Sequence, residues 1–210
     1  MAFPDTGILP ATINREKEMN SLPVKGHPEG ARLWQWMDDE PCPRVGIQEM
    51  IRNPYLLDGV MGLSLRRGKN PVIAAVNGIA MGGGFEAVLN CDLVVSSPEA
   101  EFSLPEVQRG LYAGGGGLAA IVWTCGMQIG SELALTGRRA SAEERKRLGW
   151  INVIAMSPKT VVPEAIEMAR MIASYSPDAV IATHLGLREL SERNGIRNLT
   201  ERTTQQYGRR

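Results

Sequence analysis

Residues 70–117 constrain the fold of this chain more than any other segment. They read NPVIAAVNGIAMGGGFEAVLNCDLVVSSPEAEFSLPEVQRGLYAGGGG. The run over residues 71–76 is almost continuously apolar, which is typical of a strand buried on both faces. A turn at Asn77-Gly78, a short helix over residues 83–90 and a second apolar strand over residues 92–96 follow it. This alternation of buried strands with helices predicts α/β architecture.

The N-terminal third is less regular. In chain order it predicts an extended arm (1–30), a short helix (29–40), a short strand (44–47) and turns or loops (48–70). Leu33, Trp34 and Met37 share one side of the predicted helix, and Pro41 ends it. We expect Trp34 and Trp36 to serve core packing rather than to line a ligand pocket.

The C-terminal part predicts a brief strand (101–103), helices over 118–124, 130–135 and 141–148, a last strand (150–155) and two amphipathic helices (161–174 and 177–192). Ser141 as N-cap with Glu144 three residues later forms a capping-box pattern. Helices dominate after residue 160. We therefore expect a core of residues 1–158, atypical over its first 69 residues, and a C-terminal helical region of residues 159–210.

Composition excludes several classes of function. The 23 basic and 23 acidic side chains balance, so nothing indicates a nucleic-acid or membrane partner. We interpret the short arginine clusters as solvated faces, and no apolar stretch looks long enough to span a bilayer. Three separated cysteines indicate reduced intracellular thiols, and no signal peptide is visible. The chain has only two histidines, which is few for a histidine metal site and gives little choice of base for a serine triad.

The triple glycine and two glutamates carry the chemistry. A helix beginning near Gly83 leaves its first N–H groups without intrahelical partners, at the positive end of the helix dipole. Such donors stabilise an oxyanion, and glycine lets a substrate approach the backbone. Glu86 lies near the same helix end, and Glu106 follows Pro105. Two carboxylates across a bound acyl chain can divide the labour, one activating water and the other protonating carbon.

Each part of this pattern also has a structural explanation. Glycines before a helix often form only a tight turn, and an acidic residue in a first helical turn is commonly a dipole-favoured one. The four glycines at residues 114–117 resemble a phosphate-cradling loop, although the P-loop lysine is absent. Cys91 and Asp92 fit packing and the start of a strand.

Taken jointly, residues 70–117 resemble the central signature of the crotonase, or enoyl-CoA hydratase/isomerase, superfamily. SELALTGRRASAEERKRLGWINVI resembles the downstream family block. The resemblance implies a crotonase-like ββα spiral core with a C-terminal helical region that mediates trimers or hexamers. It implies catalytic roles for Glu86 and Glu106, an oxyanion donor at Gly83, and substrate contacts at four positions: Ala80, Met81, Gly82 and Gly114.

The same resemblance implies an acyl-CoA thioester as substrate and no metal or redox cofactor. Retention of both glutamates favours hydration and dehydration. The N-terminal part resembles fungal members, including peroxisomal ones of siderophore and polyketide-toxin pathways. It implies an intracellular, peroxisomal or cytoplasmic location, although no C-terminal peroxisomal tripeptide is present.

The chain departs from the family pattern at two places. Val45-Gly46-Ile47 is not followed by a segment like AFCAGADL, which supplies the second oxyanion N–H, and Gly59 or Met61 are the candidate substitutes. The sequence also ends before the family's closing helix. Three hypotheses therefore stand: a hydratase, a thioester isomerase that uses Glu106, and an impaired or non-catalytic relative such as a truncated gene product.

Overall fold

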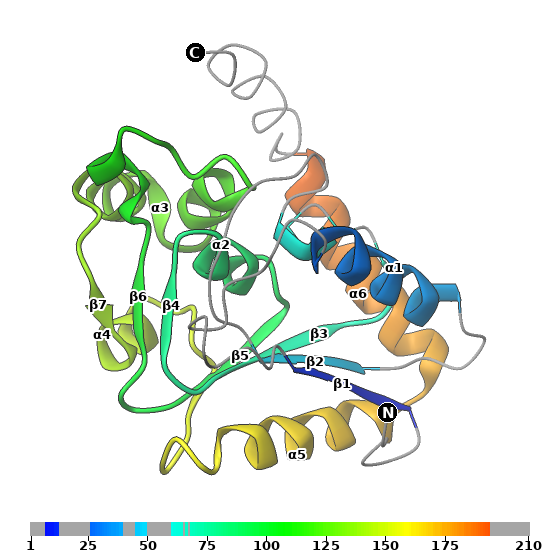
Figure 1. The fold of residues 1–210 in the computed structure, drawn as a ribbon. Coiled ribbons are helices and arrows are strands. Elements are labelled where there is room, and N and C mark those ends of the chain that lie inside the picture. Colours follow the sequence, from blue (N-terminus) through cyan, green and yellow to red (C-terminus); the bar gives the residue numbers. More distant parts are fainter. Residues whose placement is uncertain are drawn as a thin grey trace.

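The computed structural model describes residues 7–12, 26–39, 45–49, 60–64, 66 and 68–193. Within them two sheets lie side by side, and helices cover both faces of the larger one (Figure 1). The larger sheet has the order β1-β2-β3-β5-β8 and is parallel throughout. Its strands are β1 (Ile8–Thr12), β2 (Val45–Glu49), β3 (Val72–Val76), β5 (Leu93–Ser96) and β8 (Val153–Ile154).

Strand β3 is the centre of this sheet and is buried on both faces, as its apolar run predicts. Val72, Ala74 and Val76 belong to the core beneath the N-terminal helices, whereas Ile73 and Ala75 belong to a second core. The second core is covered by α5 (Val161–Ala173), which runs beneath the sheet (Figure 1). The C-terminal helices thus begin as a separate layer.

The smaller sheet carries the glycine-rich segment. It has the order β4-β6-β7, with strands β4 (Ile79–Met81), β6 (Glu101–Ser103) and β7 (Ala140–Ser141). The remaining helices are α1 (Gly26–Asp39), η2 (Val60–Gly62), α2 (Gly83–Leu89), η3 (Pro105–Arg109), α3 (Gly117–Thr136), α4 (Ala142–Arg147) and α6 (Pro177–Arg193). Because β4 pairs with β6, the turn into α2 lies next to the turn into η3.

Most predicted elements are confirmed, with shifted ends. The predicted helix over 29–40 is α1, in which Trp34 and Met37 are fully buried, whereas Trp36 is exposed. Ser141 caps α4 by accepting from the Glu144 N–H at 3.3 Å. The capping box is only half made, because the Glu144 carboxylate pairs with Arg138 instead. The domain boundary near residue 158 stays a prediction.

Some predictions are wrong. The arm over residues 1–30 contains β1 and the start of α1, and β4 and β7 had no counterpart. The two helices expected over 118–135 form one element, α3, with a break at Gly126, where φ is +82°. The long apolar helix also contradicts the expectation about membrane spans. By length and composition alone α3 is apolar enough to cross a membrane, with a mean hydropathy of 1.3, although core helices meet the same criterion.

The arginine clusters are not all solvated faces. Arg66 is largely buried and pairs with Asp38 at 2.5 Å. Arg145 is completely buried, and its guanidinium lies 4.4 Å from the ring centroid of Trp150. None of its three side-chain nitrogens has a hydrogen-bond partner in the part of the chain that the structure describes. Burial lowers the pKa of Arg145 to about 10. A buried charge without hydrogen bonds is costly, and the cation–π contact offsets only part of that cost.

Arg145 therefore yields a stability prediction. We expect Arg145→Leu to raise the free energy of unfolding by roughly 1–3 kcal/mol, because it removes an unsatisfied buried charge and keeps the apolar stem. Arg147→Leu, an exposed position on the same helix, serves as the matched control and should change stability little. Urea denaturation followed by circular dichroism measures both. A loss of stability in Arg145→Leu would show that the guanidinium has a stabilising partner.

Candidate active site

Glu86 is a buried carboxylate at the contact between two helix starts. It lies in the first turn of α2 and is 4% exposed. Its Oε2 accepts a hydrogen bond of 2.8 Å from the backbone N–H of Gly117, the first residue of α3. The Asn90 side chain donates to the Glu86 carbonyl oxygen at 2.7 Å. The glutamate is therefore held at both its backbone and its carboxylate.

The glycine run before α3 fits around this carboxylate. A Cβ added to Gly117 would lie 2.6 Å from Glu86 Cγ, and one added to Gly115 would lie 3.2 Å from both Glu86 carboxylate oxygens. Gly116 has φ of +109°, a left-handed conformation that favours glycine. The alternative of a phosphate-cradling loop is not what the structure shows, since the run encloses Glu86 instead.

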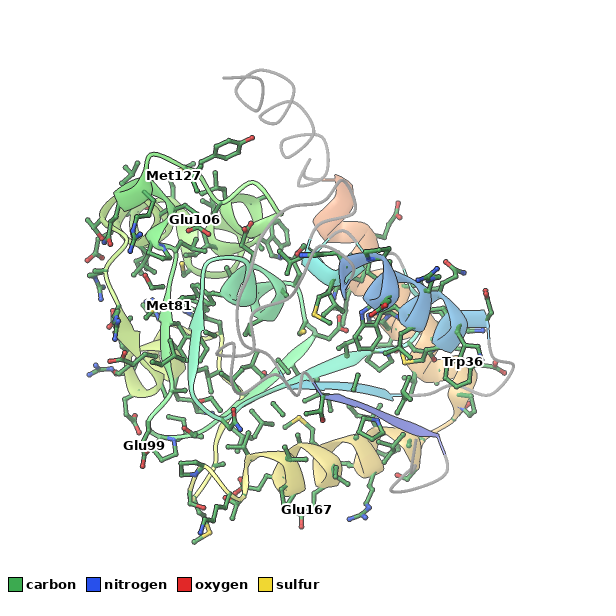
Figure 2. All side chains as sticks on the ribbon, viewed as in Figure 1. Trp36, Met81, Glu99, Glu106, Met127 and Glu167 are labelled. Atoms are coloured by element: carbon green, nitrogen blue, oxygen red, sulfur yellow. The ribbon has the colours of Figure 1, made fainter. Side chains whose placement is uncertain are left out.

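Glu106 approaches the same region from η3. Pro105 begins this short helix, and Glu106 lies near the upper ends of β4 and β6, beside α3 (Figure 2). Its Oε1 lies 3.1 Å from the point where a Cβ on Gly82 would be. Its Oε2 is buried and has no hydrogen-bond partner among the described residues. A buried carboxylate oxygen without a partner is a group available to a reacting molecule.

Both glutamates hold their protons more tightly than usual. The pKa of Glu86 is raised to about 7. Burial raises this pKa most, the hydrogen bond from Gly117 lowers it, the charge of Glu106 raises it, and a hydrogen bond from Gly115 lowers it. Burial also raises the pKa of Glu106. A carboxyl group that titrates near neutral pH can both take and give a proton there, which general acid–base catalysis requires.

The turn between β4 and α2 lies beside Glu106, whose Oε1 approaches Gly82. Gly82 has φ of +56° and ψ of −131°, which a side chain would disfavour, and its N–H donates to the Ser103 carbonyl at 3.0 Å. Across the described ranges no hydrogen bond is recorded from the Gly83 N–H, the first of the helix. The predicted oxyanion donor, the Gly83 N–H, therefore belongs to the residue after Gly82, and Gly82 lies next to Glu106.

The other predicted contacts differ in what they offer. Met81 is 8% exposed and lines a small pocket of about 380 Å³ that also includes Pro105. Ala80 is fully buried in the core, so its side chain is closed to a ligand. The Gly114 N–H donates to the Tyr112 carbonyl at 2.9 Å and is thus already engaged.

Met61, a candidate second oxyanion donor, has its N–H already engaged. Its φ of +57° is unusual for a residue with a side chain, but its N–H donates to Nδ1 of the buried His27 at 3.3 Å. The other suggested substitute, Gly59, lies outside the described residues. The contact of Met61 with His27 joins η2 to α1, segments that are 34 residues apart in sequence.

Sequence reasoning missed the residues that hold Glu86. Gly115 and Gly117 were seen only as a glycine run, because their contact with Glu86 depends on how α2 and α3 pack. Asn90 was not singled out, although its position four residues after Glu86, at the C-cap of the same helix, was a local signal. In the described part of the chain no group of three or more His, Cys, Asp or Glu side chains forms a metal-binding cluster.

The raised pKa of Glu86 gives a prediction for stability. A carboxyl whose pKa is higher in the folded than in the unfolded state favours folding below the unfolded value of 4.5, and this contribution disappears as pH rises through about 7. The difference corresponds to roughly 3 kcal/mol. We expect Glu86→Gln to remove this pH dependence. Its stability relative to the wild type should therefore be higher at pH 8 than at pH 5 in urea titrations. Glu99→Gln, at an exposed site, is the control, and equal pH curves for Glu86→Gln and the wild type would contradict the assignment.

Comparison with known proteins identifies the family. The family model described as enoyl-CoA hydratase/isomerase matches residues 57–208. The mevalonyl-coenzyme A hydratases of Beauveria bassiana and Aspergillus fumigatus are each 38% identical, over 89% of this chain and 77% of their own lengths. An enoyl-CoA hydratase structure from Mycobacterium tuberculosis superposes with a TM-score of 0.82 at 31% identity, covering 93% of this chain and 84% of that one. The chain belongs to the enoyl-CoA hydratase/isomerase family, the crotonase superfamily, and is an enzyme of the enoyl-CoA hydratase type.

Proposed function

We propose that Glu86 and Glu106 together add water to the double bond of an enoyl thioester, or remove water in the reverse direction. The observation that carries this proposal is a pair of carboxylates beside the glycine turn Gly82–Gly83: Glu86 on α2 is buried, and Glu106 on η3 is half-buried with a buried Oε2. One carboxylate takes a proton from water, whose oxygen bonds to the β-carbon. The electron pair of the double bond moves to the thioester oxygen as an enolate. The other carboxyl then gives its proton to the α-carbon.

The Gly83 N–H is the proposed donor to the enolate oxygen. A backbone donor at a helix start needs no reorganisation during the reaction, and one such donor is worth roughly a hundredfold or more in rate. We propose that the substrate contacts Gly82, where no side chain blocks its approach, and the side chain of Met81. We propose that the other two predicted contact positions, Ala80 and Gly114, shape the backbone around the substrate and make no side-chain contact with it. The chemistry needs carboxylates and N–H donors only, so we propose that no metal or redox cofactor takes part.

The relatives suggest the kind of acyl group. Two fungal relatives are mevalonyl-coenzyme A hydratases, and both match most of the chain. We therefore propose a short, branched acyl-CoA thioester as the substrate. Their fungal origin also fits the resemblance of the N-terminal part to fungal members of the family.

Exposed apolar surface and free thiols bear on assembly and location. Trp123, Met127 and Leu135 of α3 are large apolar side chains that are 47%, 60% and 74% exposed, and such surface favours association into a homotrimer or homohexamer. Cys91 and Cys125 are free thiols, which suits a reducing intracellular compartment, peroxisomal or cytoplasmic.

One observation favours the alternative of an impaired enzyme. The N–H of Met61, a candidate second oxyanion donor, is already bonded to His27. With Gly83 alone the rate would fall by roughly two orders of magnitude relative to a complete pair of donors. Thioester isomerisation, with Glu106 moving a proton between carbons, is distinguished by analysing the products formed from 2-enoyl and 3-enoyl thioesters.

Glu106→Gln tests the acid–base assignment. We expect a loss of at least roughly a hundredfold in the disappearance of enoyl-thioester absorbance with crotonyl-CoA, because an amide cannot exchange a proton. Circular dichroism should show an unchanged fold, since Glu106 Oε2 makes no hydrogen bond among the described residues. Wild-type turnover in the variant would refute a role for Glu106. A folded wild type without turnover on straight or branched thioesters would favour the impaired relative.

Gly117→Ala tests whether the position of Glu86 matters. The added Cβ would fall 2.6 Å from Glu86 Cγ, so the carboxylate must move. We expect kcat to fall by roughly tenfold or more and the pH profile of kcat/KM to shift, because the hydrogen bond to Glu86 is disturbed. Gly78→Ala is the matched control, since nothing lies within 4 Å of its added Cβ. Unchanged kcat and pH profile in Gly117→Ala would show that the contact has no catalytic role.

A further inference from the structure

A cavity of about 860 Å³ lies away from the two glutamates. It is formed at the C-terminal end of α2, against α3 and α6, whereas Glu86 and Glu106 gather at the N-terminal end of α2. Neither glutamate lines it. A volume of this size is within the range of small-molecule sites, and a pocket is normally the first place to seek one. Because the acid–base groups are elsewhere, the cavity is a separate feature of the molecule.

The walls of the cavity are mainly apolar and aromatic. Trp123 from α3, Trp150 before β8 and Tyr175 after α5 supply aromatic rings, and Ile172 and Leu187 supply aliphatic side chains. Trp150 is held by stacking on Phe85, with ring centroids 4.8 Å apart. Such walls suit a hydrocarbon chain or ring, which aromatic side chains cover at little cost in conformational entropy.

One end of the cavity is polar, and its carboxylate is already occupied. Asp92 Oδ2 accepts from the Val72 N–H at 2.8 Å. Asp92 Oδ1 contacts His184 Nε2 at 2.9 Å and accepts from Arg188 Nε at 2.9 Å. These bonds attach α6 to the start of β5, and together with Arg188 they hold the pKa of Asp92 below its usual value despite burial. An incoming polar group therefore cannot rely on Asp92 as its acceptor.

The other permanently charged groups that line the cavity are donors. Arg66 and Arg188 both line the cavity, against the single carboxylate of Asp92. Arg66 pairs with Asp38, yet its Nε is buried and has no partner among the described residues, and the same is true of Trp150 Nε1. His184 contacts the Asp92 carboxylate through Nε2, which therefore carries the ring proton. Its Nδ1 is not a donor in this arrangement, and it is buried without a partner among the described residues. A ligand that presents an acceptor oxygen to Arg66 Nε matches this end best.

We propose that this cavity is a second binding site, which takes an apolar molecule ending in a carboxylate, such as a medium-chain fatty acid. The carboxylate lies at the end formed by Arg66 and Arg188, and the hydrocarbon part lies along Trp123, Trp150 and Tyr175. Because α6 forms one wall, the bound molecule bridges α6 and the core. The inference does not depend on the proposed hydratase reaction, since the site uses neither Glu86 nor Glu106.

Isothermal titration of the full chain with decanoate, below its micelle-forming concentration, tests the proposal. We expect saturable binding with one site per chain, and slower amide hydrogen exchange in α6 when the site is filled. Decanol should bind at least roughly tenfold more weakly, because it lacks the charged head group. Absence of saturable binding would overturn the proposal, and equal binding of decanol would overturn the carboxylate assignment.

Two alanines on α6 give a matched pair of variants. Ala179 and Ala182 are both exposed, but only Ala179 lines the cavity. Ala179→Trp should fill the site and weaken decanoate binding at least roughly tenfold, whereas Ala182→Trp should leave it unchanged. Glu106→Gln should bind decanoate like the wild type, which separates this site from the proposed active site. Equal binding by the two tryptophan variants, or loss of binding in Glu106→Gln, would show that decanoate binds elsewhere.

Discussion

The hydrogen bond from the Gly117 N–H to Glu86 is the contact on which the candidate active site depends. It joins the first turn of α2 to the first turn of α3 and keeps a carboxylate almost completely out of water. Burial raises the pKa of that carboxyl to about 7, where it can exchange a proton in neutral solution. The same contact requires glycine at residue 117, because a Cβ would overlap the glutamate side chain. The contact between the starts of α2 and α3 thus sets the packing of Glu86, the pKa of its carboxyl and its proposed part in proton transfer.

The two sheets explain why two glutamates twenty residues apart belong to one site. β4 leads into α2, β6 leads into η3, and the two strands are paired neighbours. Each glutamate follows its strand closely and the two strands are parallel, so both lie beyond the same end of the small sheet, where Figure 2 shows Glu106. The large parallel sheet anchors β4 and α2. These two elements lie between β3 and β5 in the chain, and β3 and β5 are hydrogen-bonded neighbours in that sheet.

Ion pairs also help to hold two parts of the molecule in place. Asp92 attaches α6 through His184 and Arg188, and Arg66 ties the segment after η2 to Asp38 of α1. Buried ion pairs of this kind add little net stability, but breaking one partner is costly. They therefore help to specify where α6 and α1 lie, and the pairs of Asp92 with His184 and Arg188 stand at the wall of the cavity that α6 forms.

The sequence by itself determined the α/β class, the strand–glycine–helix segment and both glutamates. These follow from local patterns: an apolar run long enough for a buried strand, glycines before a helix and a capping serine at residue 141. Only the tertiary structure decided that Gly115 and Gly117 enclose Glu86, that Met61 donates to His27 and that Arg145 is buried over Trp150. Each of these contacts joins segments that no sequence period relates. These contacts depend on how helices and sheets pack, and that packing is decided by many interactions between distant parts of the chain.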